Sequence, residues 1–430
     1  MRLGYINGVL WSVGNGLTSG SLVYYLAQEL GASGAALSLL IAAPSLIGLL
    51  RLVTPALIAP LGGVKATCLK TSLVSYALLT LGLPTITLAG LVSRPATLTA
   101  LIVLICVHQL LEYVGSVALW SWLGALVPQR VRGRYFARRN LWQLAFLTPT
   151  LLASGRFVDY WKTAHKGQPD QILLGYILPA TIGGVLLLAS LAPLCWMPDV
   201  ANVRRREGSL RRATLATLLP FYDARFRRLL VYRGWFSFFN GITQAAQNVF
   251  VIRVLAVPLL TMQQLQIGMR VGQMALSPAV GRASDRYGNR PVLEVSQLLV
   301  AVALLFYAVA TPTAWWWIIG AWALWSAYTG INVCLNNLML RLAPPKENAG
   351  YIALCEATGG LAFGLSTIAG GVLLDLMQAR GATITLGPMT LDHFAILFVS
   401  GAILRAAGVF WLARIREPGA WSWRELLRGK

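Results

Sequence analysis

The sequence predicts an all-α membrane protein in which twelve transmembrane helices form two pseudo-symmetric six-helix bundles. Three observations support this prediction: an apolar composition, a series of long apolar runs, and short sequences that recur in both halves of the chain. Of the 430 residues, 57% are hydrophobic and 12% are charged, and the mean hydropathy is +0.64. A soluble domain carries about 25% charged residues, so lipid must solvate most of this chain.

The apolar runs are bounded by charges, glycines or prolines, and each is long enough to cross a bilayer, which takes about 20 residues. They cover residues 4–28, 33–60, 68–92, 96–127, 139–160 and 172–197 in the first half, and 229–255, 259–281, 290–311, 314–342, 349–377 and 391–414 in the second. Between the halves lies a basic stretch that contains Arg204-Arg205-Arg206 and cannot span. We therefore expect a first bundle over 1–199, a basic cytoplasmic linker over 200–228, and a second bundle over 229–430 with a short cytoplasmic tail.

The basic residues predict how the chain is oriented in the membrane. Lys and Arg number 36 against 15 Asp and Glu, which gives a net charge of +21. Most of them lie in alternate loops rather than on one soluble face, so nucleic acid is not an expected partner. Positive loops stay in the cytoplasm. We expect a multi-pass protein of the bacterial inner (plasma) membrane with both termini cytoplasmic, whose basic segment 130–139 contacts anionic lipids.

Other residue patterns narrow the range of functions. Five cysteines without a C-x-x-C pair predict neither a disulfide framework nor a metal site. The sequence has no P-loop and no H-E-x-x-H pattern, so we expect no cofactor, no metal and no enzymatic activity. The acidic residues are few and scattered, which argues against a membrane enzyme that acts on lipid-linked substrates. A monomer is expected.

Short sequences repeat between the two halves. Residues 15–18 (Asn-Gly-Leu-Thr) match residues 240–243 (Asn-Gly-Ile-Thr), and residues 126–137 align without gaps on 342–353. The offsets between the matched segments are similar and follow chain order. This pattern indicates a duplicated six-helix unit, an architecture found in transporters.

The most informative loop is the charged stretch Gly281-Arg282-Ala283-Ser284-Asp285-Arg286-Tyr287-Gly288-Asn289-Arg290. Its charges cannot lie in hydrocarbon, and Gly288 permits a tight turn. The pattern G-x-x-x-D-R-x-G-x-R resembles the loop motif of the major facilitator superfamily of transporters. That resemblance implies a gating loop whose charge network stabilises one conformation. Its expected members are Gly281, Asp285, Arg286, Gly288, Arg290 and, from a later helix, Glu356.

The resemblance implies a secondary active transporter that moves a small solute by alternating access, coupled to an ion or a proton, and holds it between the bundles near the bilayer midplane. The corresponding first-half loop, Pro60 to Lys65, lacks the aspartate and the arginine of the motif. The fourth helix also lacks the arginine that many proton-coupled members carry. A non-transporting relative that serves as a receptor, lipid flippase or assembly scaffold therefore remains the alternative.

Ionisable side chains inside the predicted spans are candidate site residues because they are costly in lipid. His108 and Glu112 lie one turn apart on the fourth helix and can hydrogen-bond. We expect them to form a proton-responsive pair, with a structural helix–helix bond as the alternative. Arg270 on the eighth helix is a candidate contact for an anionic substrate or for Glu112, although it can also reach the membrane surface.

Amide and aromatic side chains form further candidate substrate contacts. Amides both donate and accept hydrogen bonds, so they suit neutral polar or zwitterionic groups. Aromatic faces suit sugar rings, apolar bodies or cations. The candidates are Asn240, Gln244, Gln247 and Asn248 on the seventh helix, Trp325, Tyr328, Asn332 and Asn336 on the tenth, and Asn15 on the first. The sequence predicts a small-molecule substrate but does not identify it.

Overall fold

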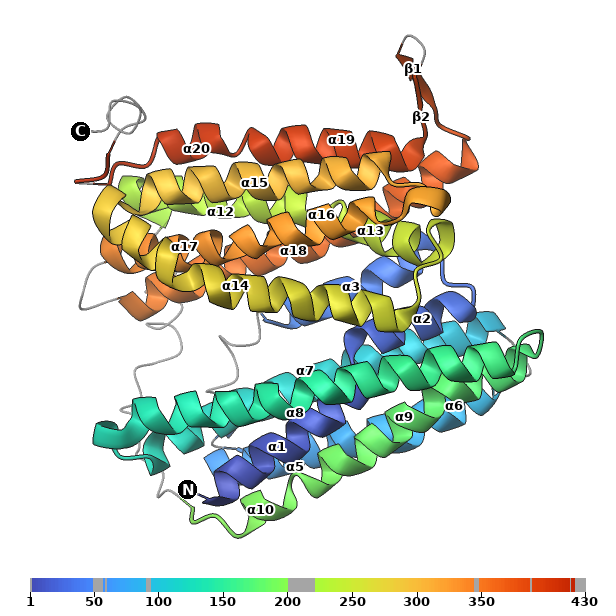
Figure 1. The fold of residues 1–430 in the computed structure, drawn as a ribbon. Coiled ribbons are helices and arrows are strands. Elements are labelled where there is room, and N and C mark those ends of the chain that lie inside the picture. Colours follow the sequence, from blue (N-terminus) through green and yellow to red (C-terminus); the bar gives the residue numbers. More distant parts are fainter. Residues whose placement is uncertain are drawn as a thin grey trace. The chain divides into compact units, whose positions relative to one another are not determined.

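Long α-helices make up almost the whole of the chain, as Figure 1 shows. The computed structural model describes residues 2–48, 57–58, 60–89, 94–199, 221–343, 348–386, 389–417 and 419–421. The chain divides into two compact units. The N-terminal unit comprises Met1–Arg204 with Val257–Gln264, and the C-terminal unit comprises Arg205–Ala256 with Leu265–Lys430.

The helices of the N-terminal unit follow the predicted apolar runs, with breaks that the sequence did not predict. They are α1 (Arg2–Leu17), α2 (Gly20–Glu29), α3 (Gly34–Ile47), α5 (Val64–Ala77), the π-helical η2 (Leu78–Gly82), α6 (Leu83–Ala89), α7 (Arg94–Leu126), α8 (Gln129–Ala164), α9 (Pro169–Ala189) and α10 (Ala192–Cys195). The first predicted helix is split because the Ser19 hydroxyl accepts from the backbone N–H of Leu22, at 3.4 Å, and so starts a second helix.

In the N-terminal unit, α1 packs against α8 and α9, and α5 packs against α7. The contact between α1 and α9 depends on small residues. A Cβ atom on Gly14 would lie 2.8 Å from the carbonyl oxygen of Gly183, so the two backbones can approach this closely only without a side chain. This close packing brings α1, α5, α7 and α8 around the polar residues described below.

The C-terminal unit has the same all-helical character with one small hairpin. Its elements are α12 (Ala224–Gly241), α13 (Gln244–Val249), the π-helical η3 (Phe250–Val254), α14 (Leu259–Tyr287, whose first residues belong to the other unit), α15 (Asn289–Val309), η4 (Pro312–Ala314), α16 (Trp317–Leu324), η5 (Trp325–Ala327), α17 (Tyr328–Leu342), α18 (Asn348–Ala379), β1 (Ile384–Leu386), β2 (Met389–Leu391), α19 (His393–Ala406) and α20 (Val409–Ala413). The hairpin pairs Ile384 with Leu391 in antiparallel register. It was not predicted, and α19 starts after it at the N-cap residue Asp392.

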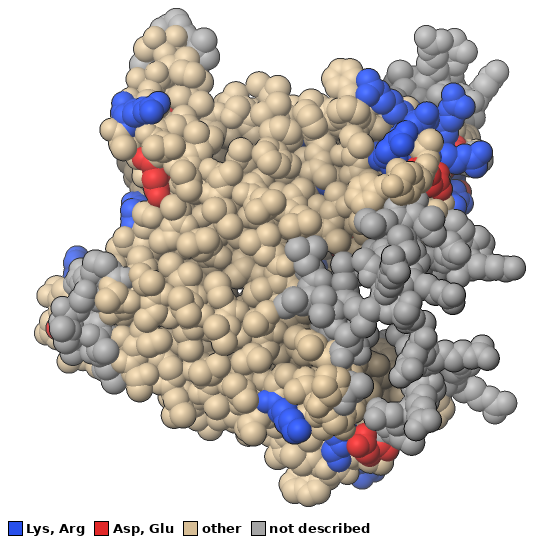
Figure 2. Space-filling view, turned by 180° about the vertical axis from the view of Figure 1, so that it is seen from behind, with Lys and Arg blue, Asp and Glu red and all other residues tan. Residues whose placement is uncertain are grey.

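The surface of α15 shows how these helices meet lipid. Val295, Leu298, Val302, Leu305 and Val309 are exposed and recur every three or four residues along one face of the helix. The opposite face is buried against α16, α17 and α19. Figure 2 shows the same pattern on the C-terminal unit, where Lys, Arg, Asp and Glu gather at the helix ends and the sides are largely uncharged. An exposed apolar stripe of this length fits a lipid-facing helix.

Seven helices within the described ranges are long and apolar enough to cross a membrane, judged by length and composition alone. They are Val64–Ile86, Ala96–Leu126, Pro169–Cys195, Asn289–Val309, Trp317–Met339, Tyr351–Ala379 and His393–Ala413. Each of the twelve predicted ranges nevertheless overlaps a helix. Of the other predicted spans, the first is interrupted between α1 and α2, and those in α8, α12 and α14 carry arginines within a helix. In the predicted span 33–60, the structure describes the shorter apolar helix Gly34–Ile47.

Candidate functional site

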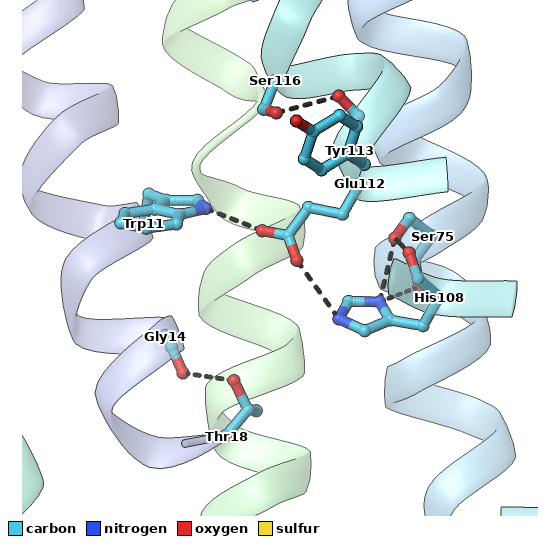
Figure 3. Close-up of polar contacts among 8 residues, drawn as sticks. All are labelled: Trp11, Gly14, Thr18, Ser75, His108, Glu112, Tyr113 and Ser116. Carbon is cyan, nitrogen blue, oxygen red and sulfur yellow. Dashed lines mark hydrogen bonds and ion pairs between the residues drawn. The ribbon is translucent and has the colours of Figure 1, made fainter. Parts of the chain in front are cut away.

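The predicted pair of His108 and Glu112 lies inside the N-terminal unit, where α1, α5 and α7 meet (Figure 3). His108 is 6% exposed, and its Nε2 atom is 3.4 Å from Oε2 of Glu112. The other carboxylate oxygen, Oε1, accepts a hydrogen bond from Nε1 of Trp11 at 3.2 Å. The carboxylate is thus held by its own helix and by α1.

The surroundings of His108 determine where its proton lies. Its Nδ1 atom is 3.2 Å from the carbonyl oxygen of Ser75, which can only accept a hydrogen bond. The Ser75 hydroxyl donates to the carbonyl oxygen of His108 at 2.9 Å and lies 2.9 Å from Nδ1, so it can accept from that nitrogen. Nδ1 is therefore the protonated nitrogen. Nε2 then faces Glu112 without a proton in the neutral imidazole, and the contact is an ion pair only if the imidazole carries a second proton.

The pair borders a cavity of about 220 Å³ within the N-terminal unit. Trp11 of α1, Tyr76 of α5 and Glu112 of α7 line it, together with Arg139 and Gln143 of α8. Cavities that bind drug-sized ligands measure about 300–1,000 Å³. The size of this cavity therefore fits a small solute.

Arg139 is the site residue that the sequence analysis missed. Its side chain is 3% exposed and lies inside the protein, where Nη2 donates to Asn7 Oδ1 at 3.1 Å, Nη1 to Gln143 Oε1 at 3.2 Å and Nε to the carbonyl oxygen of Gly4 at 3.3 Å. The guanidinium also lies over the ring of Trp120, 5.3 Å from its centroid. The basic run 130–139 was assigned to a lipid-facing loop. That assignment is wrong for Arg139, because α8 begins ten residues earlier, at Gln129.

The predicted amide row of α12 and α13 is largely engaged within the C-terminal unit. Gln247 donates to the Thr243 hydroxyl at 2.7 Å, and Asn248 donates to the carbonyl oxygen of Gln244 at 2.9 Å. Asn240 accepts from the Tyr328 hydroxyl at 2.9 Å, which joins α12 to α17.

The remaining predicted substrate contacts differ in exposure. Trp325 is buried and packs on Tyr307 and Trp322, with ring centroids 5.5 and 5.2 Å away. Asn332 and Asn336 are exposed one turn apart on α17, Arg270 is exposed on α14, and Asn15 is half-buried on α1. Among the described residues, none of these four side chains has a hydrogen bond or ion pair.

The 281–290 loop is shorter than expected, because α14 continues to Tyr287 and α15 begins at Asn289. Gly281, Asp285 and Arg286 therefore lie on the last turns of α14. Asp285 and Arg286 are exposed. Only Gly288 lies between the helices, and its φ of 93° is a conformation that glycine adopts readily.

The carboxylate that meets this loop comes from Glu417, not from Glu356. Glu417 accepts from the backbone N–H groups of Asn289 and Arg290 at 3.2 and 2.8 Å, and from Arg341 Nη1 at 2.7 Å. The expected contact of Glu356 is wrong: it pairs with Arg233 of α12 at 3.3 Å, since it lies two turns inside α18. Arg290 itself pairs with Glu294 at 2.9 Å.

A buried ionisable pair beside a cavity, enclosed by long apolar helices, is consistent with a multi-pass membrane protein. The comparisons relate the second half of the chain to a family model and nearly the whole chain to solved structures. Residues 255–422 match the family model described as the Major Facilitator Superfamily. No curated protein sequence matches the chain.

Solved structures with a similar fold cover nearly the whole chain. A D323A mutant of the nucleoside transporter NupG aligns with a TM-score of 0.70 and 13% identity over 97% of this chain and 99% of that one. The xylose transporter XylE from E. coli aligns with a TM-score of 0.59 and 14% identity over 98% of both chains. A bacterial homologue of the human drug peptide transporters PepT1 and PepT2 aligns with a TM-score of 0.60 and 16% identity over 96% of this chain and 97% of that one.

These likenesses show the fold. The chain is an all-α membrane protein with the fold of the major facilitator superfamily, as the sequence predicted. The resemblance first indicated by the 281–290 loop is confirmed for the second half by sequence and for the whole chain by fold.

Proposed function

We propose that this protein is a secondary active transporter that moves a small solute across a membrane by alternating access, coupled to a proton that the His108–Glu112 pair takes up and releases. The observation that carries the proposal is the contact between these two titratable side chains, which borders a cavity inside the helices. The fold supports it, since the similar structures include a D-xylose-proton symporter and proton dependent oligopeptide transporters.

The energetic cost of the site also supports a functional role. A charged side chain at the centre of a transmembrane helix costs about 2.5–3.5 kcal/mol on insertion scales. Glu112 lies near the middle of α7, more than two turns from either end. A structural hydrogen bond could be made by an amide at lower cost. A carboxylate and an imidazole in contact can in addition change their charge, which an amide cannot.

The arrangement of the whole chain follows from the same proposal. We propose a first bundle over 1–199, a cytoplasmic linker over 200–228 and a second bundle over 229–430, with both termini cytoplasmic in a bacterial inner membrane. Residues 200–220 of the linker, and the side chains at 130–134 and 137 that were expected to contact anionic lipid, lie outside the described residues. The protein is proposed to work as a monomer.

Proton flux into proteoliposomes tests the proposal. The purified protein is reconstituted with a pH-sensitive dye inside the vesicles, and nucleosides, sugars, amino acids and short peptides are added outside in turn. At least one solute should move protons together with itself. Glu112→Gln should abolish this proton movement even at solute concentrations where exchange without a pH gradient is still measured. The control Asp170→Asn changes an exposed carboxylate at the start of α9 and should leave both measurements unchanged.

Two outcomes would contradict the proposal in different ways. If Glu112→Gln carries protons with its solute as the native protein does, the coupling role of the pair is wrong. If a solute binds the purified protein and is never moved across the bilayer, the protein is a receptor or scaffold instead. Movement of a labelled lipid between leaflets, with no solute moved, would indicate a flippase.

A further inference from the structure

The cavity of the N-terminal unit contains two opposite charges that do not neutralise each other directly. Glu112 contacts Trp11 and His108. Arg139 lines the same cavity, and all of its hydrogen bonds go to neutral oxygens. Among the described residues, no carboxylate lies within ion-pair distance of Arg139. A buried charge without an opposite charge beside it is costly, so the Arg139 end of the cavity favours an anionic ligand group. Glu112 is paired with His108, which opposes a cation at that end only while the imidazole is protonated.

Arg139 retains hydrogen-bonding capacity for such a ligand. A guanidinium has five N–H groups. Three of them donate, one each to Gly4, Asn7 and Gln143. The two remaining N–H groups, one on each terminal nitrogen, are enough for a carboxylate, which pairs with a guanidinium through two parallel hydrogen bonds. The ring of Trp120 covers one face of the guanidinium and keeps its plane fixed.

The other end of the cavity suits a cation. Trp11 and Tyr76 flank Glu112 in the lining. The carboxylate supplies the opposite charge, and the aromatic faces attract an ammonium group through their π electrons. The Glu112 side chain is 20% exposed in the structure, so a ligand in the cavity can reach it.

The helical rise per residue along α1 and α7 gives an estimate of the distance between the two charges. On α1, Asn7 contacts Arg139 and Trp11 contacts Glu112, and these residues are one turn, or about 6 Å, apart. On α7, Trp120 contacts Arg139 and lies eight residues, or about 12 Å, from Glu112. A hydrogen bond of about 3 Å at each end leaves between about 0 Å, from the α1 spacing, and about 6 Å, from the α7 spacing, for the ligand, and the α7 value gives the upper limit of its length. This length fits the separation between the amine and the carboxylate of an amino acid or a dipeptide.

We propose that this cavity binds a small zwitterion, with its ammonium group at Glu112 between Trp11 and Tyr76 and its carboxylate on the free N–H groups of Arg139. The inference rests on the proposed function in one respect, since the zwitterion would then be the transported solute. The binding itself does not depend on transport, and it is measured separately.

A set of probes tests the inference on the native protein. Binding to detergent-purified protein is measured by calorimetry for 4-aminobutyrate and glycylglycine, and for butylamine and butyrate, which each keep one of the two charges. At least one zwitterion should bind ten times more tightly or better than both singly charged probes, a difference of about 1.4 kcal/mol. The inference is overturned if butylamine or butyrate binds as tightly as the zwitterions, or if no probe binds.

Variants assign each end of the ligand. Glu112→Gln should reduce the affinity for the zwitterion to that for butyrate, and Arg139→Gln should reduce it to that for butylamine. The matched controls are Asp170→Asn and Arg138→Gln, which alter exposed residues and should bind as the native protein does. If Arg139→Gln fails to fold, Arg139→Lys keeps the charge without the planar fork and should still weaken binding about tenfold, as the loss of a charge-assisted hydrogen bond predicts. Unchanged affinity in a folded variant at both ends would refute the assignment.

The two proposals fail in different measurements. Zwitterion binding without proton-coupled flux would leave this inference standing and refute the transport proposal. Proton-coupled flux of a sugar or nucleoside, with no zwitterion bound, would do the reverse.

Discussion

Replacing Arg405 of α19 should destabilise the C-terminal unit. Arg405 is 1% exposed, and its Nε atom donates to the carbonyl oxygen of Phe239 at 3.0 Å. Its Nη2 atom donates to the carbonyl oxygen of Asn240 at 3.1 Å and to the hydroxyl of Thr243. These acceptors lie where α12 ends and α13 begins, and carbonyl groups at a helix end lack their usual backbone partners. The arginine therefore supplies the donors that the broken helix needs.

The magnitude follows from these contacts. Hydrogen bonds between helices in a membrane contribute about 0.6 kcal/mol on average and up to about 1.7 kcal/mol, so loss of three should cost about 2–5 kcal/mol. The opposing effect is the cost of burying a charge, which a neutral side chain avoids. Arg405→Met tests which effect is larger, because methionine fills a similar volume without charge or donors. Arg405→Lys keeps the charge but loses the planar guanidinium with its several donors, so its stability should lie between that of Arg405→Met and that of the native protein.

Thiol accessibility provides the assay. Cys334 and Cys355 are fully buried in this unit, so a thiol-reactive dye should label them only when the unit opens on heating. The labelling midpoint should fall for Arg405→Met and remain unchanged for Arg380→Ala, an exposed arginine just after α18. A midpoint for Arg405→Met equal to or above the native one would show that charge burial outweighs the hydrogen bonds, and the argument would be wrong.

Three further predictions concern the junction of α14 and α15. Gly288→Ala should lower the free energy of unfolding by about 1–3 kcal/mol because of the backbone conformation at this position and because the new Cβ would lie 2.6 Å from that of Ala420. The control is Gly281→Ala, whose new Cβ would meet nothing within 4 Å. Equal melting temperatures for the two variants would contradict the prediction. Glu417→Gln should lower stability by up to about 2 kcal/mol, because the start of α15 favours a negative charge; a loss that does not shrink in high salt would argue against this cause. Asp285→Asn should raise stability slightly, since an acid near a helix C-terminus is unfavourable. If the loop has a gating role, the same variant should take up solute more slowly than the native protein. Equal uptake by the two proteins at equal abundance in the membrane would count against that role.

The positions of the helices were predictable from sequence because lipid requires long apolar runs, and each such run overlaps a helix. Helix ends were less predictable. The sequence from 130 to 139 looks like a loop because it is basic, but it contains no proline, and its one glycine, Gly133, does not end the helix. The helix therefore continues through it and carries Arg139 inside. The split between α1 and α2 depends on one serine hydroxyl, which composition does not reveal.

The candidate site was predictable in part for a related reason. His108 and Glu112 are four residues apart on one helix, so their contact follows from helical spacing alone. The contacts of Trp11, Ser75 and Arg139 join residues far apart in the chain, and a single sequence does not show which helices become neighbours. Glu417 was missed because it follows the last predicted span, where no charge network was expected.

The contact between His108 and Glu112 is built into one helix, so a rigid tilt of α7 carries both side chains along and leaves their separation unchanged. Trp11 and Ser75 belong to α1 and α5, and only these partners can be gained or lost when helices shift against each other. A displacement of α1 would remove the indole donor from the carboxylate and leave its contact with His108 in place. The first helix is thus the element through which movement of the protein would change the hydrogen bonding of Glu112.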